Sequence, residues 1–197
     1  MVAAAVALVE KEGPTALTMR RLATDLDVTT TTIYWHVGGR DELVTEIIRH
    51  QAERLAARPV EGATPRHRVM SAARHVWDSA LENPAITSLA YQTGTISLLE
   101  HPLELALVRE LEAAGVTGRP AADALRSILT TVGGFLVLAL RDDSAIPEER
   151  RSAALWSAEH QDVGADTLAA LTRPTDLPAL FETTVQAVVD HHVPDPI

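Results

Sequence analysis

Residues 16–37 read ALTMRRLATDLDVTTTTIYWHV, and this stretch decides the fold. Thr18 is placed to cap a short helix, because a threonine hydroxyl accepts a hydrogen bond from a backbone amide of the first turn. A second threonine, Thr29 or Thr30, can cap a further short helix that ends near His36. Two short helices joined by a tight turn predict a helix-turn-helix unit.

Helices on both sides of this stretch complete a small domain. Residues 3–11 form the first expected helix, which Gly13-Pro14 ends. A fourth helix begins at Asp41 and runs to about Arg58, with its apolar residues in one stripe. We therefore expect a domain over residues 1–58 that includes this fourth helix.

A linker over residues 59–65, rich in Pro, Gly and Thr, separates that domain from a larger one over 59–197. Apolar residues recur there at helical spacing, and no alternating strand pattern of useful length appears, so the class is all-α. The expected helices cover 69–81, a short segment to 91, 102–114, 121–140, 148–160 and 177–192. The end of the 121–140 helix, VGGFLVLAL, is apolar on all sides and is expected to be buried all round.

The composition fits a helical protein without thiol chemistry. Only 4% of the residues are aromatic, and Ala and Leu supply much of the apolar content, which favours helices over strands. The absence of cysteine excludes disulfides and thiolate metal sites. No apolar run approaches the roughly 20 residues of a membrane span. The apolar N-terminus stops at Glu10 and lacks the basic start of a signal peptide, so we expect a cytoplasmic protein without a membrane partner.

The net charge of −10 is unevenly distributed. Residues 1–58 carry seven Lys and Arg against eight Asp and Glu, whereas the remainder carries ten Arg against nineteen acids. The N-terminal domain is therefore near neutral, and the acidity lies in the C-terminal domain. A near-neutral domain binds DNA only if its few cations face one way, so charge alone does not predict binding.

The third helix opens with four consecutive threonines, residues 29–32. Their hydroxyls and methyls can contact phosphates, base edges or a thymine methyl, as a recognition helix does in the major groove. Threonine also caps helices by default, so the run by itself is explained at least as well by capping.

The surrounding residues favour the first explanation. The segments ALTMRRLA (16–23), LDV (26–28) and IYWHV (33–37), with Leu43, closely resemble the DNA-binding domain of the tetracycline-repressor (TetR) family. The run YWHV is similar to the tetracycline-class branch in particular. The resemblance covers about residues 1–58. It implies phosphate contacts from Thr18, Tyr34, His36 and Arg40, base contacts from Arg20, Thr30, Thr31 and Thr32, and packing of Trp35 beside the DNA backbone.

Three points qualify these implied roles. His36 at a helix end can simply interact with the negative end of the helix dipole. Gly38-Gly39 replaces a more polar pair, so we expect backbone amides to face a phosphate there. Family members usually carry further, often basic, residues ahead of the first helix, and a truncated N-terminus with weaker DNA affinity is one expectation.

The resemblance continues more weakly into the C-terminal domain. Residues 128–135, ILTTVGGF, are similar to the tetracycline-class regulatory domain, in which two long helices from each protomer form a four-helix interface. By this resemblance the helices 121–140 and 177–192 pair between two copies, and Gly133-Gly134 permits their close approach; ordinary core packing is the alternative. The implied interface residues are Leu125, Ile128, Leu129, Val132, Leu136, Phe181, Val185 and Val188.

The resemblance also implies a ligand pocket in this domain. Its candidate residues are Trp77, Tyr91, His101 and Phe135, although each by itself fits the core or the surface better. Tyr91 rather than His101 falls close to the metal-binding histidine of the tetracycline class, so no metal site is expected. His191-His192 point to different helix faces and form a poor chelating pair.

These observations predict a homodimeric repressor that leaves a palindromic operator when a small-molecule effector binds. Double-stranded DNA, the effector and a second copy of the chain are the expected partners; no cofactor is expected, and residues 58–64 are the expected hinge. The alternative is a helix-turn-helix-derived ligand-binding or interaction module without operator binding. No Gly-rich phosphate loop, His-Glu metal motif or serine elbow is present, so an enzyme is not expected.

Overall fold

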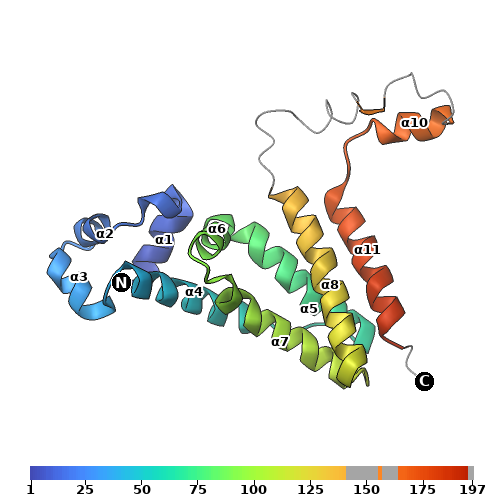
Figure 1. Cartoon of the computed structure of the whole chain (residues 1–197), viewed down its shortest axis with the longest axis horizontal. Helices are drawn as coiled ribbons and strands as arrows, with labels where there is room; N and C mark the ends of the chain where they lie inside the picture. The colour runs from blue at the N-terminus through green and yellow to red at the C-terminus, as the bar shows by residue number, and fades with distance from the viewer. Residues whose placement is uncertain (141–154, 157–163, 195–197) are drawn as a thin grey trace.

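The computed structural model describes residues 1–140, 155–156 and 164–194. Within these ranges the chain is helical and has no strand, which confirms the all-α class (Figure 1). The elements are α1 (Val2–Glu12), the 3-10 turn η1 (Pro14–Ala16), α2 (Met19–Asp25), α3 (Thr30–Val37), α4 (Arg40–Ala56), α5 (Pro65–Glu82), α6 (Pro84–Gln92), α7 (Ile96–Ala113), α8 (Gly118–Ala139), α10 (Ala165–Leu171) and α11 (Leu177–His192).

Threonine caps set the starts of α2 and α3. The hydroxyl of Thr18 accepts a hydrogen bond from the backbone N–H of Arg21 at 3.1 Å. The hydroxyl of Thr29 accepts one from the backbone N–H of Thr32, also at 3.1 Å. Each bond satisfies an amide that the helix itself leaves without a partner. Both helices therefore begin where the capping residues predicted.

One hydrophobic core runs through both halves of the chain. The head, which we define as α1 to α3, joins the C-terminal helices through α4, which packs along α7 and against α1. In addition, α6 touches α1, η1 and α4 on one side and α5 and α7 on the other. Figure 1 shows α6 between the head and the C-terminal helices. Any movement of α6 would therefore act directly on α1 and η1 of the head.

The C-terminal helices form a bundle in which α5 is covered by α7, α8 and α11. Figure 1 shows α8 and α11 side by side, at the opposite end of the molecule from α2 and α3. Three buried aromatic rings join the bundle. Trp77 stacks on Phe181 with ring centroids 4.5 Å apart, and Phe135 meets both rings edge-on, at 6.2 Å and 5.6 Å respectively.

Several helices differ from the expected ranges. Helix α7 begins at Ile96 and continues through Pro102, where the sequence predicted its start. Helix α10 was not predicted. The helix expected over residues 148–160 falls almost wholly outside the described residues.

The C-terminal part of α8 has the predicted length but not the predicted burial. Phe135 is buried, but Val137 is 73% exposed, and Leu138 and Leu140 are also exposed in a single chain. The prediction that this run is buried all round is therefore wrong for one protomer. By length and composition α8 could also cross a membrane, which was not expected. Core helices pass the same test, and α8 packs on α5, α7 and α11, so this is weak evidence for a span.

Candidate functional site

The outer face of α3 presents three polar or aromatic rings to solvent. Ile33 is fully buried and anchors the helix, while Tyr34 is 51% exposed and Trp35 is 82% exposed. His36 lies against the indole edge, with the two ring centroids 4.9 Å apart. An indole this exposed costs free energy in water, because its apolar area is left uncovered. The exposed rings make this face a candidate contact surface.

The threonines of α3 divide into two kinds. The hydroxyls of Thr29 and Thr32 lie 2.9 Å apart and bond each other, so both are engaged in the cap. Thr31 is exposed and makes no hydrogen bond to the described part of the chain, while Thr30 is partly buried. The run therefore supplies the helix cap through Thr29 and Thr32, and it leaves Thr31 exposed as the candidate contact residue.

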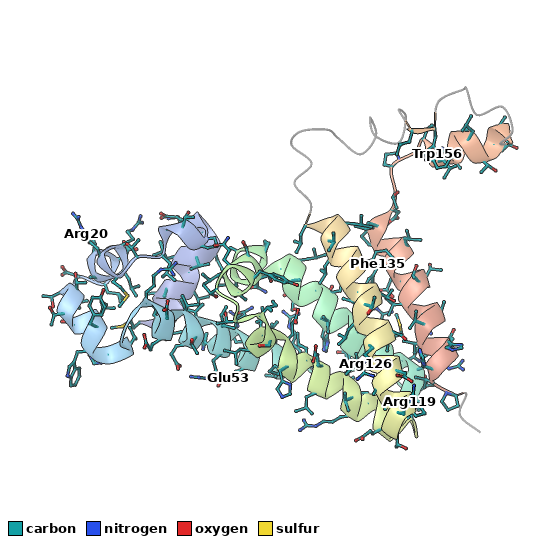
Figure 2. All side chains as sticks on the ribbon, viewed as in Figure 1. Arg20, Glu53, Arg119, Arg126, Phe135 and Trp156 are labelled. Carbon is teal, nitrogen blue, oxygen red and sulfur yellow. The ribbon has the colours of Figure 1, made fainter. Side chains whose placement is uncertain are left out.

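The two arginines of α2 have different surroundings. Arg21 forms ion pairs with Glu12 of α1, at 2.8 Å, and with Asp25 of α2, at 2.9 Å. Hydrogen bonds to Asp25 and then Glu12 raise the pKa of Arg21 above its usual value, so this cation holds α1 to α2. Arg20 is exposed, has no ion pair with a described residue, and points away from the molecule (Figure 2). Of the two arginines, Arg20 is therefore the one without an ion pair among the described residues.

The turn between α3 and α4 does not offer the free amides that the sequence suggested. The backbone N–H of Gly38 donates to the carbonyl of Tyr34 at 2.9 Å, which ends α3. The N–H of Gly39 donates to the carboxylate of Glu42, also at 2.9 Å. The expectation that these amides face a phosphate is therefore wrong in this state. Arg40, exposed at the first position of α4, remains the candidate phosphate contact.

A cavity lies among α5, α6, α7 and α8. It consists of two adjoining hollows of about 140 Å³ and 30 Å³ that share four residues in their walls: Val76, Tyr91, Glu100 and Leu136. Of the four predicted pocket residues, Tyr91 lines both hollows. Trp77 and Phe135 instead belong to the aromatic core, and His101 is exposed and lines neither hollow.

The polar groups of this cavity were not predicted. Glu100 and Glu104 stand one turn apart on α7 and both line the larger hollow. Burial, and then the charge of Glu104, raise the pKa of Glu100 above its usual value. Thr87 of α6 lines the smaller hollow, and its buried hydroxyl has no hydrogen-bond partner among the residues that the structure describes. The four-residue spacing of the two glutamates could have indicated that they share one face of a helix. Because the helix was expected to begin at Pro102, Glu100 was left outside it and the pair was not recognised.

The predicted interface residues are also divided by the structure. Ile128, Val132, Phe181 and Val185 are buried within one protomer, where α8 meets α11. Leu125, Leu129, Leu136 and Val188 are half-buried and flank an exposed strip of each helix. That strip consists of Arg126, Thr130, Gly134 and Val137 on α8, and Leu180, Thr183 and Ala187 on α11.

The linker after α4 is held in place by several contacts. The guanidinium of Arg68 binds Glu110 of α7 through two hydrogen bonds of 2.7 Å and donates to the carbonyl of Val60 at 3.2 Å. The N–H of Glu61 donates to the hydroxyl of Ser71 at 3.0 Å. These bonds tie residues 60 and 61 to α5, so the linker is clamped rather than loose.

Comparisons with known proteins agree with this architecture. Residues 1–47 match the family profile of bacterial regulatory proteins, tetR family. No curated protein matches the chain. A solved structure of a possible TetR family transcriptional regulator from Streptomyces coelicolor A3(2) is 25% identical, with a TM-score of 0.69 over 96% of this chain and 95% of that chain.

Two further solved structures resemble the chain along its length. BioQ from Mycobacterium smegmatis is 26% identical, with a TM-score of 0.60 over 98% of this chain and 95% of that chain. ActR from Streptomyces coelicolor is 19% identical, with a TM-score of 0.70 over 98% of this chain and 92% of that chain. ActR has been crystallised with actinorhodin and with (S)-DNPA. The chain therefore carries a TetR-family N-terminal domain over residues 1–47 and has the fold of TetR-family transcriptional regulators.

Proposed function

We propose that this protein is a homodimeric transcriptional repressor that binds a palindromic operator and releases it when a small-molecule effector binds. The observation that carries the proposal is the outer face of α3, where Thr31, Tyr34, Trp35 and His36 are exposed together. Arg20 projects from the neighbouring helix (Figure 2). Exposed hydroxyl, aromatic and guanidinium groups on the two neighbouring helices are the types of group that major-groove readers present to bases and phosphates.

The division of the chain into a DNA-binding domain over 1–58 and an effector and dimerisation domain over 59–197 is part of this proposal. Effector binding in the cavity would act through α6, because this helix lines the cavity with Thr87 and Tyr91 and also touches α1 and η1. We therefore propose that α6, rather than the linker over residues 58–64, is the element that moves. The effector must bind the released conformer more tightly, since only differential affinity shifts the equilibrium.

Dimerisation would use the exposed strip of α8 and α11. This strip lies at the far end of the molecule from α3, so a partner seated there leaves the head free (Figure 1). A two-fold dimer then presents two α3 helices that read the two halves of a palindrome about 34–36 Å apart. ActR, which shares the fold, is known in complex with actinorhodin, and this supports the proposal that the present chain also binds a small molecule.

The test begins with selection of bound duplexes from a random DNA pool by the purified full chain. The enriched site should be palindromic, and its affinity should fall steeply with salt, because phosphate neutralisation releases counterions. Arg20→Ala should weaken binding by about 1–3 kcal/mol if this arginine reads one base in each half-site. Arg109→Ala is the matched control, since Arg109 is an exposed arginine of α7 without an ion pair in the described residues.

An operator-free interaction module is the second candidate, and one observation favours it. The domain over 1–58 offers little free positive charge, because its net charge is −1 and Arg21 is paired with Glu12 and Asp25. In addition, the carboxylate of Glu42 accepts the hydrogen bond of the Gly39 amide at the start of α4. If no duplex is enriched, the repressor proposal is wrong and this module becomes the better description. If a duplex is enriched but Arg20→Ala and Arg109→Ala bind it equally well, the base contact assigned to Arg20 is wrong.

A further inference from the structure

The cavity among α5, α6, α7 and α8 combines an apolar wall with a negative one. Leu99, Leu103, Leu129 and Val132 supply apolar surface, while Glu100 and Glu104 stand four residues apart on one face of α7. Like charges at this spacing repel and destabilise a helix. No Lys, Arg or His lines either hollow, and neither glutamate forms an ion pair among residues 1–140, 155–156 and 164–194. The negative charge at this site is thus uncompensated within the described part of the protein.

A second observation points independently to a ligand. Thr87 is 5% exposed, and its hydroxyl oxygen has no hydrogen-bond partner within the described part of the chain. A buried hydroxyl without a partner is unfavourable, because it has lost its bonds to water and gained none in return. Thr87 lines the hollow whose walls also include Glu100 and Tyr91. It is therefore an unused hydrogen-bonding group at the wall of the same cavity.

The aromatic ring of Tyr91 borders both hollows and is 61% exposed. The face of an aromatic ring carries partial negative charge and attracts organic cations. Two carboxylates, an aromatic face and an unpaired hydroxyl within apolar walls are complementary to an ammonium group on an apolar body. A metal ion fits less well, because divalent cations of the calcium type require six or more oxygen ligands. No cluster of three potential metal ligands occurs among the described residues.

We propose that this cavity binds a small amphipathic organic cation, a protonated amine whose charge lies between Glu100 and Glu104. The inference rests on the proposed function in one respect, namely that this cavity is the effector site. The apolar body would occupy the space lined by Leu99, Leu103 and Leu136. The hydroxyl of Thr87 would accept a hydrogen bond from the ligand or donate one to it. Anions of the same shape are excluded by the glutamates.

Three probes of matched shape test the charge preference: 4-phenylbutylamine, 4-phenylbutan-1-ol and 4-phenylbutyrate. Binding of each to the full chain is measured by isothermal titration calorimetry at neutral pH without DNA. The amine should bind at least about tenfold more tightly than the alcohol, because a charge-assisted contact in a partly buried site exceeds a neutral one. The butyrate should show no binding at about 1 mM. Equal binding of amine and alcohol, or no binding of the amine, overturns the proposal.

Variants assign the preference to this site. Glu100→Gln and Glu104→Gln should each reduce the advantage of the amine over the alcohol by about tenfold or more, since the replaced amide carries no charge. Glu112→Gln, an exposed glutamate of the same helix without an ion pair among the described residues, is the matched control and should leave the advantage unchanged. Amine binding that survives both cavity variants places the site elsewhere and overturns the proposal.

Two further measurements are needed. The melting temperature separates a misfolded variant from one that has lost the binding site, and operator release separates loss of the effector role from loss of the site. Without ligand, Glu100→Gln should melt at a higher temperature than the unmodified chain, because it removes an uncompensated, partly buried charge. A lower melting temperature contradicts the role given to Glu100. Because binding is measured without DNA, amine binding without operator release would refute the effector role and leave the amine site intact.

Discussion

At the scale of a residue, Asp27 shows how the turn of the helix-turn-helix is made. It has a φ of 52°, and among the described residues it is the only one other than glycine in the left-handed region. This conformation lets the N–H of Val28 reach the carbonyl of Ala23 at 3.0 Å and close the end of α2. Aspartate tolerates the region better than most residues, although glycine suits it best.

A substitution series at Asp27 tests this account. Asp27→Gly and Asp27→Asn should unfold at nearly the same urea concentration as the unmodified chain. Asp27→Val should lower the free energy of unfolding by about 1–2 kcal/mol, because a β-branched side chain clashes in the left-handed region. Equilibrium urea denaturation followed by circular dichroism measures the difference. Equal stability of the valine variant would show that the turn does not hold this conformation in solution.

At the scale of an element, the sequence predicted helices best where a cap or an apolar stripe marks them. Thr18 and Thr29 located α2 and α3 to within one residue, since the cap is a local interaction. The predicted start of α7 at Pro102 was wrong; it had been placed there because proline is common at helix starts. Here Leu99, Leu103 and Leu107 keep one face buried on both sides of it, and tertiary packing outweighs the missing N–H. Local signals cannot report such packing.

Helix α5 carries the clearest pH-dependent group. Burial, and then the positive charge of Arg58, lower the pKa of His75, whereas the acidic groups that face it, Asp78, Glu61 and Glu82, oppose this more weakly. Below a pH of about 6.5 the unfolded chain therefore binds more protons at this position than the folded one. The contribution of His75 to stability is present above this pH and is lost as the pH falls.

We expect the free energy of unfolding to drop between pH 7.5 and pH 5.5, and the drop to be smaller in His75→Gln, which cannot take up a proton. Asp78 has the opposite sign, because burial and then the charge of Glu82 raise its pKa. The contribution of Asp78 to the free energy of unfolding falls as the pH rises above about 3.8. Its effect therefore lies toward the acidic side of the pH interval in which His75 titrates. Urea denaturation at both pH values measures the effect. His50→Gln, at a half-buried histidine of α4, is the control. An undiminished drop in His75→Gln would refute the assignment.

At the scale of the whole molecule, the sequence predicted the exposed groups of α2 and α3 more completely than the cavity. The residues of α3 and Arg20 form a contiguous local motif, so a family resemblance carries them together. The cavity is assembled from four helices, and its glutamates and Thr87 are recognisable only once α6 and α7 are placed beside α5. Trp77 and Phe135 looked like pocket residues because aromatic residues are scarce, yet they stack with Phe181 in the core.

The outer strip of α8 raises the question of what covers it. Gly133 lines the cavity, whereas Gly134 is exposed on α8, and a methyl group added at Gly134 would meet no atom of the described residues of one chain. A glycine in such a position costs about 0.5–1 kcal/mol relative to alanine. In a lone protomer nothing offsets this cost, and Val137 beside it is left uncovered. Both features are accounted for if a second α8 approaches closely at Gly134.

Gly134→Glu should therefore separate the dimer into monomers without unfolding the chain, because the new carboxylate finds room in one protomer but clashes and loses water in the interface. Sedimentation velocity would report half the mass of the unmodified protein, while circular dichroism stays helical. Gly164→Glu, at an open position before α10, is the control and should keep the mass of the unmodified protein. A Gly134→Glu protein that remains dimeric would move the interface away from this strip, and an unmodified chain that is monomeric would remove the reason for a glycine at this position. In the dimeric case the variant should also bind the palindromic operator far more weakly, since each monomer reads only one half-site.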